Sequence, residues 1–221
     1  MRKSQSWLVL LLGAGVIGSP AWAVDWRAPR VVTLSCSGCH GIDGNTDSSI
    51  APRLAAQSVG YLTTQMNAYR LAASPLADAI PFLRREEKPG ARTDDEARRS
   101  MIGPAQSIDA EELKAAVDWY AQQKAAPGRS VGDSQVLARG AKIYAEGLPD
   151  DGVSACAGCH GPKAEGRGNQ FPRLAGQHSE YLLRQLKLFA EDKRSAATMG
   201  VTAHALPRAD MKAVAEYLQQ L

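Results

Sequence analysis

The chain has 221 residues, of which 44% are hydrophobic and 22% are charged, and Gly and Pro together account for 32. This composition is typical of a folded protein, and it excludes collagen-like chains, disordered chains and proteins with many membrane spans. The formal net charge of +3 is far below the concentrated basic footprint of a nucleic-acid binder, so no nucleic-acid partner is expected. Only 13 residues are aromatic, which is few for two cores and suggests that something other than side chains fills the interior.

An export signal is predicted for residues 1–23. Two cations near the start precede an apolar run over residues 7–17, and Ala21-Trp22-Ala23 forms a small-x-small cleavage site. An uncleaved membrane anchor is disfavoured, because the run is shorter than the roughly 20 apolar residues that a membrane span needs. The mature chain is therefore expected to begin at Val24 and to be exported.

Two parts of the sequence repeat each other at an offset of 120 residues. Cys36-Ser37-Gly38-Cys39-His40-Gly41 aligns with Cys156-Ala157-Gly158-Cys159-His160-Gly161, and the segment Pro-Arg-Leu-Ala at 52–55 aligns with the same four residues at 172–175. Over positions 36–69 this offset gives 13 identities in 34. An internal duplication is the simplest explanation, so two domains are expected.

The register of the repeat changes after residue 71. Met101 aligns with Met199, and Trp119 with Tyr217, only at an offset of 98, so the first half carries 22 extra residues. This insertion, at residues 71–100, contains several prolines and a dense run of mixed charge. It is expected to be either a solvated surface loop or a docking surface for a partner protein.

The boundary between the domains is predicted from a stretch that contains Pro and Gly. Residues 126–134 begin Ala-Pro-Gly-Arg-Ser-Val-Gly and are expected to form a linker. The predicted organisation is therefore an N-terminal domain over residues 24–125 and a C-terminal domain over residues 135–221.

Helical patterns occur in both halves, and no alternating strand pattern of useful length does. Apolar residues recur at helical spacing over residues 61–71 and again over 181–189. The closing helix of the first half is predicted over 109–124, because it starts with the capping-box spacing Asp-x-x-Glu. Its counterpart is predicted over 207–221, where proline occupies the first turn. We therefore expect an all-α fold.

The four cysteines form two Cys-x-x-Cys pairs, and a histidine follows each pair directly. In this arrangement two thiols add to the vinyl groups of a haem, and the adjacent imidazole binds the iron. The motifs predict two covalently bound haem c groups, one in each domain, which would also explain the low aromatic count. The predicted attachment residues are Cys36, Cys39, Cys156 and Cys159, and the predicted iron ligands are His40 and His160.

Two other uses of paired cysteines fit the sequence less well. A structural zinc site could take all four thiolates, but zinc gives no reason for a histidine directly after each pair. A thioredoxin-like redox pair needs a strand-turn-helix context, which the sequence pattern lacks. Haem attachment is the favoured interpretation.

Methionines in matching register predict the second iron ligand of each haem. Met101 and Met199 occupy equivalent positions in the two halves, each 12 residues before the same position of the closing helix. A thioether there would complete His/Met ligation, which raises the reduction potential and leaves no open site for a substrate. Met66 and Met211 fall in apolar helical stripes and are expected in the core.

Pro52 and Pro172 each follow an iron-binding histidine by 12 residues. At this spacing the proline either marks a simple turn or presents a carbonyl that accepts the second N–H of the imidazole. The remaining histidines, His178 and His204, have no histidine partner in the first half. They are expected to be exposed or locally bonded.

The residues described so far make the chain similar to the dihaem cytochromes c4, a family within the class I cytochromes c. The resemblance spans nearly the whole mature chain. It rests on the two Cys-x-x-Cys-His-Gly motifs, on Pro-Arg-Leu-Ala-x-Gln followed by Tyr-Leu-x-x-Gln, on the late methionine, and on the segment 140–144 that leads to the second haem motif.

The resemblance implies two class I cytochrome c domains packed about a pseudo-twofold axis, with haem propionates facing each other across the interface. It implies that Pro52 and Pro172 accept from the proximal histidines, and it makes Arg53 and Arg173 candidates for contact with the propionates.

The chain departs from the family pattern in the first domain. In the second domain Gly140 and Tyr144 are expected to pack against the closing helix near Tyr217. The first domain lacks the equivalent glycine, so Trp119 must find another partner.

The resemblance also implies a periplasmic electron carrier with redox proteins as its partners. The donor would be a quinol-oxidising complex or a dehydrogenase, the acceptor would be a terminal oxidase, which can be membrane-bound, or another acceptor, and no small-molecule substrate is expected. Two alternatives stay open. One is a dihaem enzyme with a catalytic iron, for which His204 near Met199 is the candidate group. The other is an electron-accepting subunit of a dehydrogenase of the thiosulfate dehydrogenase type, with residues 71–100 as its contact surface.

Overall fold

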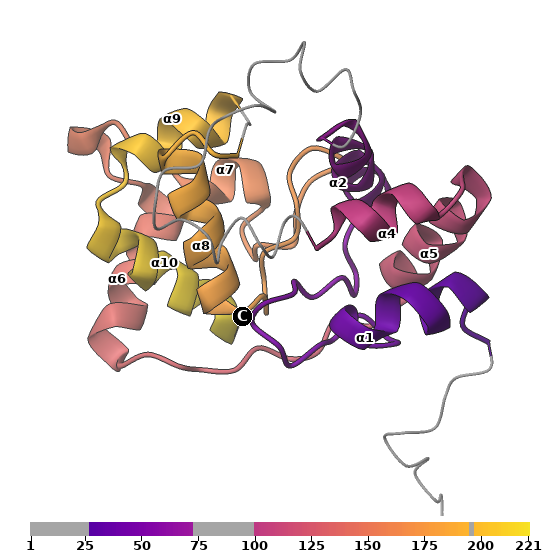
Figure 1. Cartoon of the computed structure of the whole chain (residues 1–221). Coiled ribbons are helices and arrows are strands. Elements are labelled where there is room, and N and C mark those ends of the chain that lie inside the picture. Colours follow the sequence, from indigo (N-terminus) through magenta and orange to yellow (C-terminus); the bar gives the residue numbers. More distant parts are fainter. Residues whose placement is uncertain (1–26, 73–99, 195–196) are drawn as a thin grey trace, which may run out of the picture.

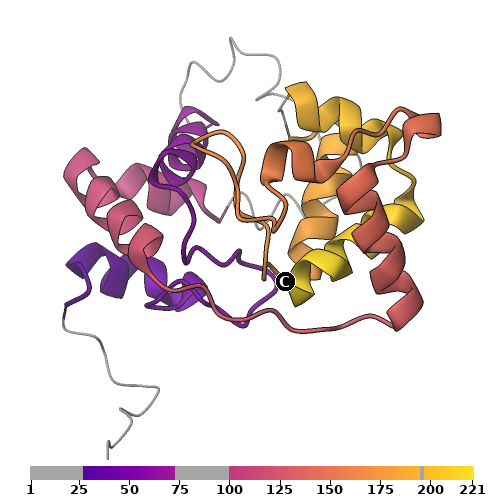
Figure 2. The same cartoon turned by 180° about the vertical axis from the view of Figure 1, so that it is seen from behind.

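A computed structural model of the chain describes residues 27–72, 100–194 and 197–221. The predicted export signal and nearly all of the insertion at 71–100 lie outside these residues. Figures 1 and 2 show two helical halves side by side, joined by an extended stretch of chain along one edge, with the C-terminus between the halves. Among the described residues, no helix is long and apolar enough to cross a membrane.

The first half begins with a π-helical turn that runs directly into the first haem motif, and a pair of helices closes it. Its elements are η1 (Val32–Cys36), α1 (Ser37–His40), α2 (Val59–Ala72), α4 (Ile102–Ser107) and α5 (Ala110–Gln122). The predicted capping box is present at the start of α5, where Asp109 accepts from the Glu112 backbone N–H and Glu112 accepts from that of Asp109.

The second half repeats this order but opens with a full helix that is separated from its haem motif by a loop. Its elements are α6 (Ser134–Glu146), η3 (Pro149–Asp151), α7 (Cys156–His160), α8 (Ser179–Ala190), α9 (Ala197–Ala205) and α10 (Arg208–Gln220). Asp133 caps α6 by accepting from the backbone N–H groups of Gln135 and Val136. Within the described part of the chain the only β-type pairings are two isolated bridges, so the expected all-α fold is confirmed.

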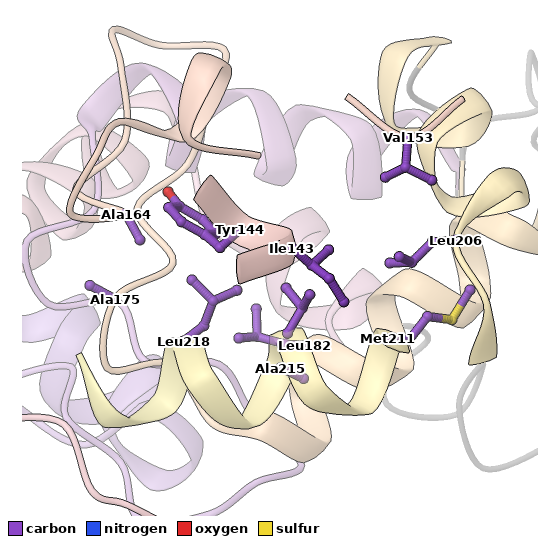
Figure 3. Packing of buried hydrophobic residues seen from close by; sticks show 11 residues of the cluster. Ile143, Tyr144, Val153, Ala164, Ala175, Leu182, Leu206, Met211, Ala215 and Leu218 are labelled. Atoms are coloured by element: carbon purple, nitrogen blue, oxygen red, sulfur yellow. The ribbon is translucent and has the colours of Figure 1, made fainter. Parts of the chain in front are cut away.

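Each half has its own hydrophobic core. The core of the second half is formed by residues of α6, α8 and α10 together with the loop between them, and Figure 3 shows Ile143, Tyr144, Leu182 and Leu218 converging there. Met211 is 2% exposed in this cluster, as expected from its helical stripe. The first core is smaller and gathers the opening turns, α2 and α5, with Met66 packed against it.

The expected packing of Gly140 against the closing helix is confirmed. A Cβ atom on Gly140 would lie 2.1 Å from the carbonyl oxygen of Ala213, so only glycine lets α6 and α10 approach this closely. The rings of Tyr144 and Tyr217 pack beside this crossing with their centroids 5.7 Å apart. In the first half, Trp119 instead donates its indole N–H to the Ile42 carbonyl at 2.7 Å.

Candidate haem-binding sites

The two motif histidines occupy equivalent, buried positions at the ends of α1 and α7. His40 is 5% exposed and His160 is 6% exposed. The Nδ1–H of His40 donates to the Pro52 carbonyl at 2.9 Å, and that of His160 donates to the Pro172 carbonyl at 3.0 Å. Burial lowers the pKa of both imidazoles, so both are neutral, and the prolines fix the tautomer that leaves Nε2 for a metal.

The first cysteine of each pair lies one turn before its histidine, the second directly precedes the histidine, and none forms a disulfide. Cys36 and Cys156 are the more enclosed member of each pair, and burial raises the pKa of both thiols to about 11. The attacking thiol of a redox pair has a lowered pKa, so the thioredoxin-like alternative is disfavoured. Among the described residues, no three His, Cys, Asp or Glu side chains converge on a possible metal site.

Met101 and Met199 hold matching places beside a short helix in each half. Met101 is the residue before α4, Met199 lies in the first turn of α9, and both side chains are half-buried. Of the methionines that the structure describes, Met66 and Met211 pack in the two hydrophobic clusters, whereas Met101 and Met199 belong to neither cluster. Core packing is therefore a weak explanation for the matched pair.

In each half, a tyrosine hydroxyl donates a hydrogen bond to the backbone carbonyl of the glycine that follows the motif histidine. In the second half the Tyr144 hydroxyl, from α6, donates to the Gly161 carbonyl at 2.6 Å. In the first half the Tyr120 hydroxyl, from α5, donates to the Gly41 carbonyl at 3.1 Å. Each haem motif is thus tied to a helix of its own half, although the two helices are not equivalent.

The two candidate propionate arginines differ in their contacts. Arg53 donates to the carbonyls of Thr46 and Gly176 and lies 3.9 Å from Asp47. Arg173 has a buried Nε that finds no hydrogen-bond partner among the described residues. A small hollow between the halves is lined by both arginines. A buried guanidinium N–H without an acceptor fits the presence of an acidic group such as a haem propionate.

Four hydrogen bonds cross between the halves in a reciprocal pattern. Gln57 Oε1 accepts from the Arg173 backbone N–H while its Nε2 donates to the Arg173 carbonyl. Gln177 makes the same two bonds to the backbone of Arg53. Because the two glutamines are equivalent in the repeat, this exchange follows the pseudo-twofold axis, and it fixes one half against the other.

His178 contradicts the expectation that it is exposed or locally bonded, so that prediction is wrong. The residue is 9% exposed, and its Nε2–H donates across the domain interface to the Thr46 carbonyl at 2.8 Å. Nearby, Arg184 donates to the carbonyls of Ser49 and Ile50. These hydrogen bonds attach the loop at residues 46–50 of the first half to α8 and to the residue before it.

His204 is exposed and locally bonded, as expected. Its Nδ1–H donates to the Gly200 carbonyl one turn earlier, and its Nε2 lies 3.9 Å from Asp192. It therefore faces other groups on the surface of the second half, which weakens its candidacy as an acid-base group for an enzyme.

Sequence reasoning missed the interface roles of several residues. Gln57 and Gln177 are visible as identities in the repeat, and a polar residue kept in both copies is a signal for a shared contact. Arg194 bridges the halves through three hydrogen bonds, but it has no counterpart in the repeat that could draw attention to it.

Comparison with known proteins agrees with this geometry. The Cytochrome c family profile matches residues 27–124 and 137–221. A cytochrome c4 of Stutzerimonas stutzeri is 32% identical, with 96% of each chain covered, and a cytochrome c-552 of Acidithiobacillus ferridurans is 33% identical over 100% of this chain and 90% of its own. The crystal structure of reduced cytochrome c4 from Pseudomonas stutzeri superposes with a TM-score of 0.72 at 29% identity, covering 86% of this chain and 94% of that one.

Two further relatives are named for thiosulfate oxidation. A thiosulfate dehydrogenase electron acceptor of Thiomonas intermedia is 28% identical over 94% of this chain and 89% of its own. A thiosulfate dehydrogenase structure from Marichromatium purpuratum superposes with a TM-score of 0.66 at 29% identity, covering 83% of this chain but 36% of that one. The full-length matches and the two equivalent motifs agree: the chain carries two covalently bound haem c groups, is an electron-transfer cytochrome, and belongs to the dihaem cytochrome c4 family.

Proposed function

We propose that the protein is a periplasmic electron carrier that accepts electrons from one redox protein and delivers them to another. The haems are attached through Cys36 and Cys39 in the first domain and through Cys156 and Cys159 in the second. Each bound haem supplies one reversible electron-transfer centre. The donor is a quinol-oxidising complex or a dehydrogenase, and the acceptor is a terminal oxidase, so no small-molecule substrate is bound.

The observation that carries this proposal is the equivalent placement of one histidine and one methionine in each half. Hydrogen bonds to Pro52 and Pro172 hold His40 and His160 with Nε2 directed away from the proline. Met101 and Met199 are the described methionines in matching register outside the packed cores. With a ligand on both sides of each iron, the metal has no open position for a substrate, which suits electron transfer and not catalysis.

The sulfur ligands can be tested with Met101→Ala and Met199→Ala. Each variant should lose the charge-transfer absorption of its Met-ligated haem, bind carbon monoxide at one haem per chain, and show a lower reduction potential at that haem, because thioether ligation favours ferrous iron. Met211→Leu is the matched control, since it changes a methionine that packs in the core. A Met101→Ala or Met199→Ala protein with a native spectrum and native potentials would reject that methionine as a ligand.

The export and loading of the protein can be tested by mass analysis of the periplasmic fraction. The mature chain should begin at Val24 and carry the added mass of two haem groups. A chain found in the cytoplasm with its first 23 residues intact would contradict the proposed location.

A second function is favoured by the relatives named for thiosulfate oxidation. In this alternative the chain is the electron-accepting subunit of a periplasmic dehydrogenase and stays bound to it. Affinity purification of the full chain from its own cells distinguishes the two cases. A free carrier elutes alone, whereas a subunit elutes in a constant ratio with a dehydrogenase and is reduced when thiosulfate is added.

A further inference from the structure

Arg194 lies at the junction of the two halves and bonds to both. The residue is half-buried and follows the C-terminal end of α8. Its Nη1 donates to Gln185 Oε1 of its own half at 2.6 Å. Its Nη2 donates across the interface to Gln65 Oε1 at 2.8 Å and to the Tyr61 hydroxyl at 2.9 Å.

The partners of Arg194 are related to each other by the internal repeat. Gln65 and Gln185 are equivalent at the offset of 120, and so are Tyr61 and Tyr181. A single guanidinium that bonds to both members of a symmetric pair must lie close to the pseudo-twofold axis. The guanidinium therefore lies at a place that the two halves share.

The charge of Arg194 is not cancelled by its hydrogen-bond partners. All three are neutral groups, two amides and one phenol, and the guanidinium carbon lies 4.7 Å from the centroid of the Phe189 ring. Burial raises the pKa of the Tyr181 phenol, so this neighbour is also neutral near pH 7. Burial opposes the charge of Arg194 itself, but the facing phenols raise its pKa, and it remains a cation.

We propose that the single positive charge of Arg194 acts on both haem sites. It favours the reduced form of each haem to a similar extent and so raises both reduction potentials. The ferric state of a haem carries one more positive charge than the ferrous state, so a nearby cation in a weakly screened place disfavours oxidation. Because Arg194 lies near the axis that relates the two halves, neither haem is singled out. The inference rests on the two haem sites and not on the identity of the redox partners.

This shared effect differs from that expected of Arg53 and Arg173. Each of those arginines belongs to the segment that follows one histidine, so a change there should act mainly on one haem. Loss of Arg194 should instead move both reduction potentials in the same direction.

The test is spectroelectrochemical titration of the purified two-haem protein with Arg194→Met. The methionine keeps an apolar stem over Phe189 and removes the charge. Both haem equilibria should shift toward the ferric form by about threefold to tenfold, where tenfold corresponds to about 59 mV for one electron. Arg208→Met is the matched control, because Arg208 is 73% exposed and water screens its charge.

Two further variants separate charge from structure. Tyr61→Phe removes one hydrogen bond of Arg194 but keeps its charge, so it should weaken the domain contact and leave both potentials near their native values. Gln185→Glu places a carboxylate on the guanidinium and should lower both potentials even if Arg194→Met does not fold.

The outcomes are distinct. Potentials that are unchanged in Arg194→Met or Gln185→Glu, or a shift confined to one haem, would overturn the inference while leaving the carrier function intact. Loss of a haem from the wild-type spectrum would instead count against the proposed function.

Discussion

In both halves a tyrosine hydroxyl donates to the carbonyl of the glycine after the haem motif, but the two tyrosines come from opposite ends of their domains. Tyr144 reaches Gly161 from the opening helix of the second half, whereas Tyr120 reaches Gly41 from the closing helix of the first. The first half opens with a short helical stretch that runs directly into its haem motif, and no tyrosine occurs between residue 27 and Cys36 to reach the carbonyl from the opening end. The closing helix takes over the bond.

The different origin of the tyrosine in each half is accompanied by a difference at a neighbouring position. Gly44 and Ala164 are equivalent, and both have left-handed backbone conformations, with φ of 75° and 55°. A Cβ on Gly44 would lie 2.7 Å from the Ala55 backbone nitrogen and 2.8 Å from the Tyr120 ring, and position 218, which matches Tyr120, holds a leucine. The tyrosine on the closing helix is thus one of two close contacts that favour glycine at position 44, whereas the second half, with its tyrosine elsewhere, has alanine at the equivalent position. Duplicated domains can thus keep one contact while changing which helix supplies it.

The largest effect is expected from Gly140→Ala, which disrupts the close crossing of α6 and α10 in the second half. The new methyl group would collide with the Ala213 carbonyl and force α6 away from α10, lowering the free energy of unfolding by about 3 kcal/mol. Denaturant titration of the two-haem protein measures this loss. Gly103→Ala in α4 is the control, because no atom lies within 4 Å of the place that its methyl group would take, and it should be neutral or slightly stabilising.

The next effect concerns the pairing of Gly44 with Tyr120. Gly44→Ala should cost about 2 kcal/mol, from the left-handed backbone and from contact with the tyrosine ring. Adding Tyr120→Leu, which copies the residue of the second half, should make the two costs less than additive in a double-mutant cycle. Full additivity would show that the ring does not require the glycine.

A smaller effect is expected from removing each tyrosine hydroxyl. Tyr144→Phe should cost about 1.5 kcal/mol, because its bond is short and buried, and Tyr120→Phe about 1 kcal/mol. Thermal unfolding monitored at the haem absorption band of each variant compares them. If Tyr120→Phe proved the more damaging, the closing helix would hold its motif more firmly than the opening helix does.

The smallest effect is a pH dependence that belongs to one half. His178 has a serine, Ser58, as its counterpart, and burial lowers the pKa of its imidazole below the ordinary value of 6.5, against the bond to Thr46 and the nearby charges of Asp47 and Glu180. The unfolded chain therefore binds a proton more readily than the folded one. Stability from this residue is present above pH 6.5 and is lost as the pH falls below that value.

His178→Gln tests this dependence, because the amide can still donate to Thr46 and does not titrate. Its unfolding free energy should fall less steeply between about pH 6.5 and 5 than that of the wild type. Parallel pH profiles for the two proteins would exclude His178 as the source.

Local signals in the sequence predicted much of the fold and the sites. The capping box at Asp109, the helices around 61–71 and 181–189, and the two haem motifs depend on short-range spacing that a single sequence displays. The carbonyls of Pro52 and Pro172 accept from the histidine imidazoles, which is one of the two possibilities that the 12-residue spacing left open. The proposed iron ligands Met101 and Met199 came from the repeat and stay a prediction.

The contacts between the halves could not be predicted in the same way. Burial of His178 and the bridge made by Arg194 depend on which surfaces meet, and that is decided by tertiary packing and not by local pattern. The tyrosine exchange was hidden for a related reason, since Tyr120 and Tyr144 do not align in the repeat and only the structure shows that they make the same bond.

The reciprocal bonds of Gln57 and Gln177 have a consequence for how such a chain can arise. Each glutamine reads the main chain of the opposite half, so the paired surfaces are self-complementary, as in an isologous dimer of identical subunits. A single copy of one half would carry both the glutamine and the backbone segment to which the glutamine of the other copy bonds. Joining two such copies through a linker adds no new contact at this interface. The linker only keeps two surfaces that already match close to each other.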